Sequence, residues 1–284
     1  MKYFLIALLV VFFGAAAYYF FVLREPPAPV SVIEPVVTVQ PESPPQAEPE
    51  VEGVEAPAAL DGGGEPFAAE PLPSLEDSDP VVLESMAGVI GEDLVARYFV
   101  TENLIPRLVA TLSMLSGKQV AAAMMPVHSM DSAFEANLDF DPPDLITNAQ
   151  GDPLSQYLVD PVNYQRYAPY VELLESIDMT RLAAIYQRQQ ALFQQAYEEL
   201  GYPDGNFNSV LLETVDMLLA APSPAEPVRL VKPEAYYLFA DPALEALPAG
   251  QKLMIRMGNA NAQRVKTLLR EFRAALTAAG IGQG

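Results

Sequence analysis

An almost unbroken apolar segment at the amino terminus, residues 3–23, constrains this 284-residue chain more than any other feature. Lys2 and Arg24 bracket the segment, which is as long as the roughly 20 apolar residues that a helix needs to cross a bilayer. It also resembles a signal peptide, because Gly14 and three alanines follow its first ten-residue apolar stretch. Apolar residues resume directly after the alanines, which favours an uncleaved anchor over residues 1–24, with the lipid bilayer as its partner.

The charges beside this anchor predict its orientation. After Arg24 no lysine or arginine occurs before Arg97, whereas acidic residues recur throughout. Cytoplasmic loops next to a membrane span are usually rich in lysine and arginine. We therefore expect a single-pass inner-membrane protein with a cytoplasmic amino terminus and a periplasmic carboxyl-terminal domain. The chain has no cysteine, so neither a disulfide nor a thiolate-metal site is expected.

Residues 25–77 have the composition of a disordered linker. They are rich in proline and glutamate, as the sequence PESPP at residues 41–45 illustrates. Proline interrupts helices and strand ladders, and repulsion between the acidic residues keeps the coil extended. We therefore expect a membrane anchor, a proline- and glutamate-rich linker, and a folded domain over residues 78–284.

Periodic apolar residues predict that the domain is mostly helical. The expected helices cover residues 80–90, 92–116 with a bend or break at Pro106, 161–177 with an interruption near Pro169, 178–200, 208–220 and 260–279. Asp79, Asp160 and Asp241 each precede a proline, and such pairs fit helix starts. Residues 117–160 contain too many helix breakers to assign, and only short runs such as 228–231 look like strands. The predicted fold class is all-α, a helical bundle with irregular connections.

Several short segments of this domain carry a resemblance to a known family. They are NYQRYAPYV at residues 163–171, AYEELGYP at 196–203, FADP at 239–242, GQKL at 250–253, RMG at 256–258 and VK at 265–266. Together they resemble an uncharacterised family of single-pass envelope proteins of proteobacteria, catalogued only as a domain of unknown function. The resemblance covers most of residues 75–276. It implies an anchor, a proline-rich spacer and a helical domain, and it carries over no catalytic residue.

Tyrosines in the middle of the chain form one candidate binding region. Tyrosine has an apolar ring and a polar tip, so it suits a groove for peptide or sugar and also the rim of a helical core. The residues singled out are Tyr164, Tyr167 and Tyr170, together with Tyr202, Asn206 and Asn208 in the turn between two predicted helices. We favour the rim of the core for the tyrosines. The turn is expected mainly to connect the helices, with one of its asparagines as a cap.

A basic stripe on the carboxyl-terminal helix is the second candidate. At about 100° per residue, Lys266, Arg270 and Arg273 align next to an apolar face. The chain has a net charge of −21, and this is its one concentrated basic surface. The cations either balance acids of the same domain, which we favour, or dock an acidic partner or a membrane surface. The negative net charge and the predicted export argue against binding of nucleic acid.

Catalytic motifs are absent from the sequence. His128 is the single histidine and has no cysteine or H-E-x-x-H arrangement beside it, so a zinc site is not expected. Met124, Met125 and Met130 near it could suit a soft cation such as Cu(I), but methionine is more often a core residue, and no metal site or cofactor is expected. Glu172 and Glu175 are spaced as a carboxylate pair on a helix, although acids on an exposed face are commoner. We expect a membrane-anchored periplasmic binding or assembly protein of the cell envelope, whose partner is an envelope protein or a cell-wall component. The alternatives are an envelope hydrolase that uses carboxylates of the tyrosine-rich region, and a structural spacer or assembly factor that oligomerises through the carboxyl-terminal helix.

Overall fold

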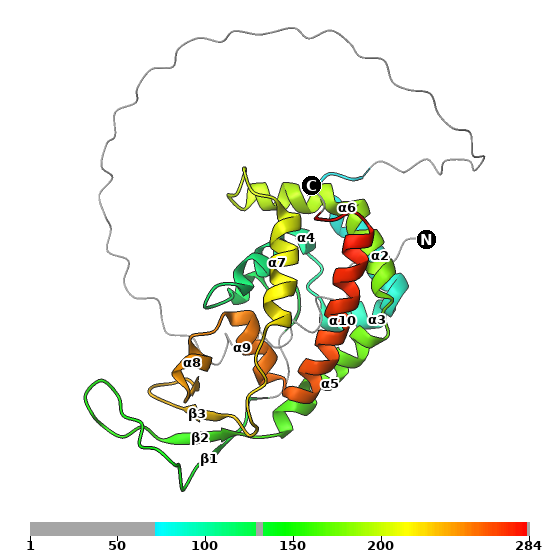
Figure 1. Cartoon of the computed structure of the whole chain (residues 1–284). Coiled ribbons are helices and arrows are strands. Elements are labelled where there is room, and N and C mark those ends of the chain that lie inside the picture. Colours follow the sequence, from blue (N-terminus) through cyan, green and yellow to red (C-terminus); the bar gives the residue numbers. More distant parts are fainter. Residues whose placement is uncertain (1–71, 129–132, 283–284) are drawn as a thin grey trace, which may run out of the picture. The chain divides into compact units, whose positions relative to one another are not determined.

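The folded part of the chain is described here from a computed structural model that covers residues 72–128 and 133–282 (Figure 1). The predicted anchor and nearly all of the predicted linker, residues 1–71, lie outside these ranges. Inside them, no helix combines the length and the apolar character that a bilayer crossing requires. Packing begins close to the start of the described chain, because Leu75 is only 6% exposed and belongs to the main core.

Helices make up most of the described chain. They are α2 (Ser78–Ile90), α3 (Glu92–Tyr98), α4 (Leu104–Leu115), the 3₁₀ turn η1 (Ala122–Met124), α5 (Val162–Glu175), α6 (Met179–Glu199), α7 (Phe207–Leu219), α8 (Pro242–Glu245), α9 (Ala249–Arg256) and α10 (Asn259–Ala278). The helices predicted over residues 178–200, 208–220 and 260–279 are confirmed as α6, α7 and α10. Their ends carry local signals, such as the Asp178 carboxylate, which accepts hydrogen bonds from the Thr180 and Arg181 amides.

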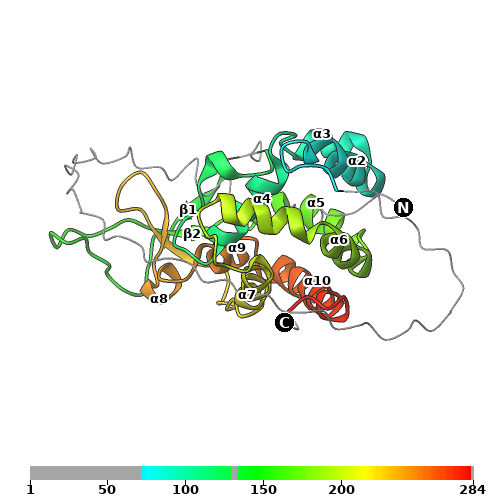
Figure 2. The ribbon, with the colours of Figure 1, turned by 90° about the horizontal axis from the view of Figure 1, so that it is seen from above.

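Helix α10 organises the helical core. It packs against α5, α6, α7 and α9 (Figure 2). Helix α4 also packs against two of these helices, α6 and α7. The predicted apolar stripe of α10 faces inward, because Val265, Leu269, Phe272 and Leu276 are each at most 2% exposed. Burial of one such side chain stabilises a fold by about 1.5–3 kcal/mol. The bundle therefore rests mainly on this stripe and the helices around it.

The helix predicted over residues 92–116 is broken into α3 and α4, and the break lies before Pro106. Helix α3 ends at Tyr98 because the following residues form backbone hydrogen bonds with a distant segment, from the Val100 amide to the Pro126 carbonyl over 2.9 Å. Pro106 then fits into the first turn of α4, where a helix has no need of that amide. The predicted interruption near Pro169 is absent, since Pro169 lies within the continuous helix α5.

The prediction of an all-α fold is wrong, because the described chain also contains a four-stranded antiparallel sheet. Its strands are β1 (Ala136–Leu138), β2 (Gln156–Val159), β3 (Arg229–Val231) and β4 (Leu238–Phe239), in the spatial order β1-β2-β3-β4. Only β3 coincides with a run predicted to be extended. Strands of two to four residues are too short to show an alternating pattern. In addition, β2 pairs with β3 although α5, α6 and α7 lie between them in the sequence.

One face of the sheet is apolar and joins it to the helices. Val159, Leu230 and Phe239 on this face form a second core cluster with Ile255 of α9. Tyr157 extends the cluster, because its ring meets that of Tyr237 edge-on at 5.1 Å between centroids. The opposite face carries the polar side chains of Gln156 and Arg229, and the segment between β1 and β2 lies against them.

Candidate functional site

The connection between β1 and β2, residues 139–155, holds the two most exposed large apolar side chains of the described chain. Phe140 is 89% exposed and Leu145 is 78% exposed. Figures 1 and 2 both show this segment, drawn in green, leaving the sheet and extending away from the helices. We call residues 139–155 the apolar loop. Large apolar side chains displayed in this way are typical of a surface that another molecule covers.

Polar contacts fix the base of the apolar loop to the sheet. The Arg229 guanidinium of β3 donates to the Gln156 side-chain oxygen, and its Nε lies 3.7 Å from the Asp139 carboxylate. The Gln156 amide nitrogen in turn donates to the backbone carbonyl of Asp144 over 2.5 Å. Because Gln156 is only 3% exposed, these contacts form a buried polar anchor beneath the loop.

The outer part of the apolar loop is a small turn with its own hydrogen bonds. The Asn148 side-chain oxygen accepts from the Gln150 and Asp152 amides, and the Leu154 amide donates to the Ile146 carbonyl over 2.8 Å. Two consecutive prolines at residues 142–143 restrict the backbone between Phe140 and Leu145. The loop thus has a defined conformation in the free protein, which lowers the entropy lost when a partner binds.

The region around the apolar loop is strongly acidic. Residues 133–160 contain no lysine or arginine and six acidic residues, namely Glu135, Asp139, Asp141, Asp144, Asp152 and Asp160. Hydrogen bonds from the Val162 amide and the Asn137 side chain hold the pKa of Asp160 below its usual range. Arg229 approaches only Asp139 and Asp144, the latter at 4.0 Å. The exposed apolar side chains therefore belong to an acidic stretch of the chain.

The tyrosines predicted as binding residues do not form one groove. Tyr167 and Tyr170 of α5 are buried in the helical core, where Tyr170 meets the ring of Tyr98. Tyr164 packs its ring against Gly258, and burial together with the charge of Glu226 raises the pKa of its phenol to about 12. These positions are those of residues at the rim and inside of a core, which is the interpretation favoured from the sequence.

The turn after α6 holds the remaining candidates of that set. Tyr202 is half exposed and stacks on Tyr197, with 4.8 Å between the ring centroids. The Asn206 side chain caps α7 by accepting from the Ser209 amide, while Asn208 accepts from the Tyr186 hydroxyl. The asparagines therefore serve the connection between α6 and α7.

The basic stripe on α10 is largely engaged within the domain. Lys266 is buried and donates to the Ala221 carbonyl, and burial followed by the charge of Arg270 lowers its pKa. Arg273 makes two hydrogen bonds to the Asp216 carboxylate of α7, at 2.5 and 2.9 Å. Arg270 is exposed. The three cations therefore do not present a continuous basic surface.

The predicted carboxylate pair and the single histidine form no reactive cluster. Both Glu175 oxygens accept from the Arg264 guanidinium at 2.7 Å, and these hydrogen bonds lower the pKa of Glu175. A general acid needs the opposite shift. His128 is exposed, and the described residues contain no group of three or more histidine, aspartate or glutamate side chains arranged to hold a metal ion.

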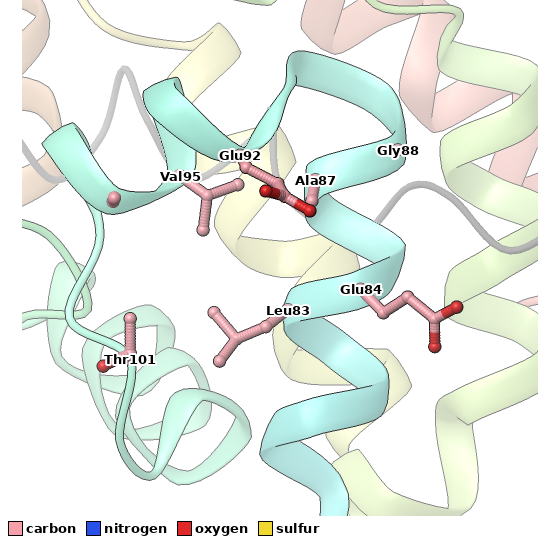
Figure 3. A pocket seen from close by; sticks show the side chains of 8 residues that line it. Leu83, Glu84, Ala87, Gly88, Glu92, Val95 and Thr101 are labelled. Atoms are coloured by element: carbon pink, nitrogen blue, oxygen red, sulfur yellow. The ribbon is translucent and has the colours of Figure 1, made fainter.

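A shallow depression lies between α2 and α3 and is a further candidate site (Figure 3). Its volume is about 550 Å³, and Leu83, Ala87 and Val95 line it together with Thr101. Two carboxylates, those of Glu84 and Glu92, stand on its sides, but Figure 3 shows the Glu84 side chain pointing away from the other labelled residues. The depression has no convergent polar groups of the kind that fix a small molecule.

Comparison with family models decides the relationship of the chain. Residues 104–273 match the model of a protein of unknown function, DUF3014. The chain belongs to the DUF3014 family. Comparison with curated proteins and with solved structures gives no match. The predicted membership of a family of unknown function is thus confirmed, while the envelope location of the resemblance remains a prediction.

The DUF3014 match separates the two surface features. It includes the complete sheet and the apolar loop, and it begins after the depression between α2 and α3. The apolar loop therefore lies within the matched range. Sequence reasoning missed it, although Phe140 and Leu145 stand among aspartates and prolines, a setting typical of an exposed segment.

Proposed function

We propose that this DUF3014 protein is a membrane-anchored periplasmic binding or assembly protein of the cell envelope that docks a protein partner on its apolar loop. The observation that carries this proposal is the display of Phe140 and Leu145 on a loop with a buried polar anchor. The same domain buries other phenylalanines, namely Phe99, Phe207 and Phe272. Two apolar side chains exposed to water on a well-defined loop gain favourable free energy when a partner protein buries them.

The magnitude of this contact suits a specific interaction. Burial of a phenylalanine or leucine side chain contributes about 1.5–3 kcal/mol each. Together Phe140 and Leu145 supply a compact centre for an interface, and the acidic residues around them supply a polar rim. The two prolines between them limit the conformations that binding must restrict.

Partner recovery from cells tests this proposal. The full chain carries an affinity tag, and proteins recovered with it after chemical cross-linking are compared between the wild type and the Phe140→Ser/Leu145→Ser variant. We expect at least tenfold lower recovery of a specific envelope protein, since removal of both apolar groups weakens binding by more than about 1.4 kcal/mol. Leu200→Ser, at a leucine that is 42% exposed at the end of α6, is the matched control and should retain recovery. Equal recovery with all three chains contradicts the proposal.

The location is the second part of the proposal. It is supported by the apolar segment at residues 3–23 and by the absence of lysine and arginine between Arg24 and Arg97. Protease treatment of intact spheroplasts checks it. A periplasmic domain is digested under these conditions, whereas a domain that survives faces the cytoplasm and contradicts this part of the proposal.

The alternative of an envelope hydrolase receives no support from the described residues. Its best carboxylate, Glu175, is occupied by Arg264, and its tyrosines lie in or beside the core. Oligomerisation through α10 is also unsupported, because Leu268 and Phe272 are buried against other helices of the same chain. We therefore propose the binding function alone.

A further inference from the structure

The open edge of β1 adds a second feature next to the apolar loop. In the sheet order β1-β2-β3-β4, strand β1 pairs on one side only, with β2 (Figure 1). No other strand within residues 72–128 and 133–282 pairs with its outer side. An unpaired strand edge presents backbone donors and acceptors that another chain can pair with, and natural sheets shorten, charge or cover such edges.

The register of β1 shows which backbone groups face outward. The Asp139 amide donates to the Gln156 carbonyl over 2.9 Å, and the Asp160 amide donates to the Glu135 carbonyl over 3.2 Å. Residues in an antiparallel pair alternate between those that bond to the partner strand and those that point away from it. Because Glu135 and Asp139 bond to β2, the N–H and C=O groups of Ala136 and Leu138 point to the open side.

The open edge and the apolar loop are continuous. Leu138 is the last residue of β1 and is itself 44% exposed, and Phe140 follows two residues later. A chain segment added beside β1 therefore runs toward the exposed ring of Phe140. Its backbone can bond to Ala136 and Leu138 while one of its apolar side chains contacts Phe140.

The acidic residues near β1 indicate what kind of chain segment could bind along its open edge. The six acidic residues of 133–160 oppose a second copy of β1, whose own acids would be brought alongside. They also oppose the linker of the same chain, since residues 25–77 are acidic and contain no lysine or arginine. A segment that carries lysine or arginine is attracted to the edge.

We infer that β1 takes up an extended basic segment of a partner protein as an added fifth strand, with an apolar side chain of that segment against Phe140. This inference rests on the proposed docking function and specifies its mode. The backbone bonds hold the segment, the acidic rim selects for lysine and arginine, and the loop recognises an apolar residue.

A phage-displayed library of random dodecapeptides, selected on the immobilised full chain, tests the inference. We expect enriched peptides that alternate apolar residues with lysine or arginine. Resynthesised peptides with alternate backbone amides N-methylated should bind at least tenfold more weakly when the methylated face is the one that bonds to β1. Enrichment of acidic peptides, equal binding after methylation on either face, or no enrichment at all would overturn the inference.

Two variants of the chain place the peptide on the edge. Leu138→Pro removes the outward N–H without breaking the β1–β2 ladder, because proline is tolerated on edge strands. It should weaken binding at least tenfold, whereas Leu138→Ala, which keeps the N–H, should weaken it by less than about threefold. A folding control by circular dichroism accompanies both variants, and the methylated peptides decide the matter if Leu138→Pro unfolds.

The same peptides separate this inference from the proposed function. If Phe140→Ser/Leu145→Ser abolishes peptide binding while Leu138→Pro and methylation do not, strand addition is wrong and docking on the loop stands. If Leu138→Pro and methylation abolish binding while the double variant has no effect, strand addition stands, whereas the contact with Phe140 and docking on the loop are both wrong.

Discussion

The Arg229 guanidinium on β3 lies with its Nε 3.7 Å from the carboxylate of Asp139, the first residue of the apolar loop. The same guanidinium donates to Gln156, which binds the Asp144 carbonyl farther along the loop. Arg229 therefore joins the central strand β3 to the apolar loop at two points, directly at Asp139 and through Gln156 at Asp144. Its removal leaves Asp139 without this counter-charge and Gln156 without this donor.

Arg229→Ala should loosen the apolar loop while the helices keep their packing. We expect faster amide hydrogen exchange over residues 139–155 and a loss of about 1 kcal/mol in the free energy of unfolding. Hydrogen exchange with mass spectrometry measures the first effect. Lys232→Ala is the control, because Lys232 directly follows β3 and its ammonium lies over the Tyr237 ring, 5.0 Å from the ring centroid. Unchanged exchange over 139–155 in Arg229→Ala would show that the loop is held in another way.

Asp79 caps a helix other than its own. Helix α2 begins at Ser78, so Asp79 is already inside its first turn, and its carboxylate accepts from the Asn103 and Leu104 amides at the start of α4. Asn103 has a left-handed backbone and makes no side-chain cap. Asp79→Ala should therefore destabilise the fold by about 1–2 kcal/mol in urea denaturation. Asp77→Ala, at an exposed residue without a cap bond to α2, should change stability by less than about 0.5 kcal/mol.

Gly258 and Gly91 give a matched test of steric packing. Their φ values are +84° and +89°, a region that strains any side chain, so alanine at either position costs about 1–3 kcal/mol. At Gly258 the new Cβ would also meet the Tyr164 ring at 2.7 Å, whereas at Gly91 nothing lies within 4 Å. Gly258→Ala should therefore be the more destabilising by about 1–3 kcal/mol in thermal or urea unfolding.

The Tyr164 ring is the cause of this difference, and a double variant checks it. In the presence of Tyr164→Ala, the extra loss at Gly258→Ala should disappear, which gives a favourable coupling between the two substitutions. Strictly additive losses would mean that the backbone strain alone determines the effect.

Tyr164 should also make stability depend on alkaline pH. Its phenol has a pKa of about 12, because burial and the charge of Glu226 disfavour the phenolate, compared with about 10 in the unfolded chain. The folded state therefore retains a proton that the unfolded state loses, and this contribution to stability declines as pH rises from about 10 to 12. Relative to Tyr164→Phe, the wild type should lose about 1 kcal/mol between pH 9 and pH 11 in urea denaturation. Parallel pH profiles of the two chains would contradict this assignment.

The long helices could be predicted because their signals are local. Asp178 at the start and Gly201 at the end bound an apolar pattern of 3.6-residue period, and α6 occupies that interval from Met179 to Glu199. The sheet could not be predicted in this way, since β2 and β3 are short and three helices separate them in the sequence. Residues 117–160, which include β1 and β2, could not be assigned because they contain too many helix breakers.

The candidate site shows a similar division. The spacing of Lys266, Arg270 and Arg273 on one helix suggested a basic surface, but the partners of Lys266 and Arg273, which are Ala221 and Asp216, belong to other segments and are not visible from that spacing. The exposure of Phe140 was missed for a different reason. An aromatic residue in a sequence is usually expected to be buried, and the neighbouring aspartates and prolines were the one local sign that Phe140 is exposed.

The most direct measurement of the docking proposal is photo-cross-linking in living cells with benzoylphenylalanine placed at residue 140 of the full chain, and at Leu200 as the control. Both positions are exposed, but only the first lies on the apolar loop. The docking proposal predicts a discrete covalent adduct with an envelope protein from residue 140 and none from residue 200. Absence of an adduct at residue 140, or the same adducts from both residues, would contradict it.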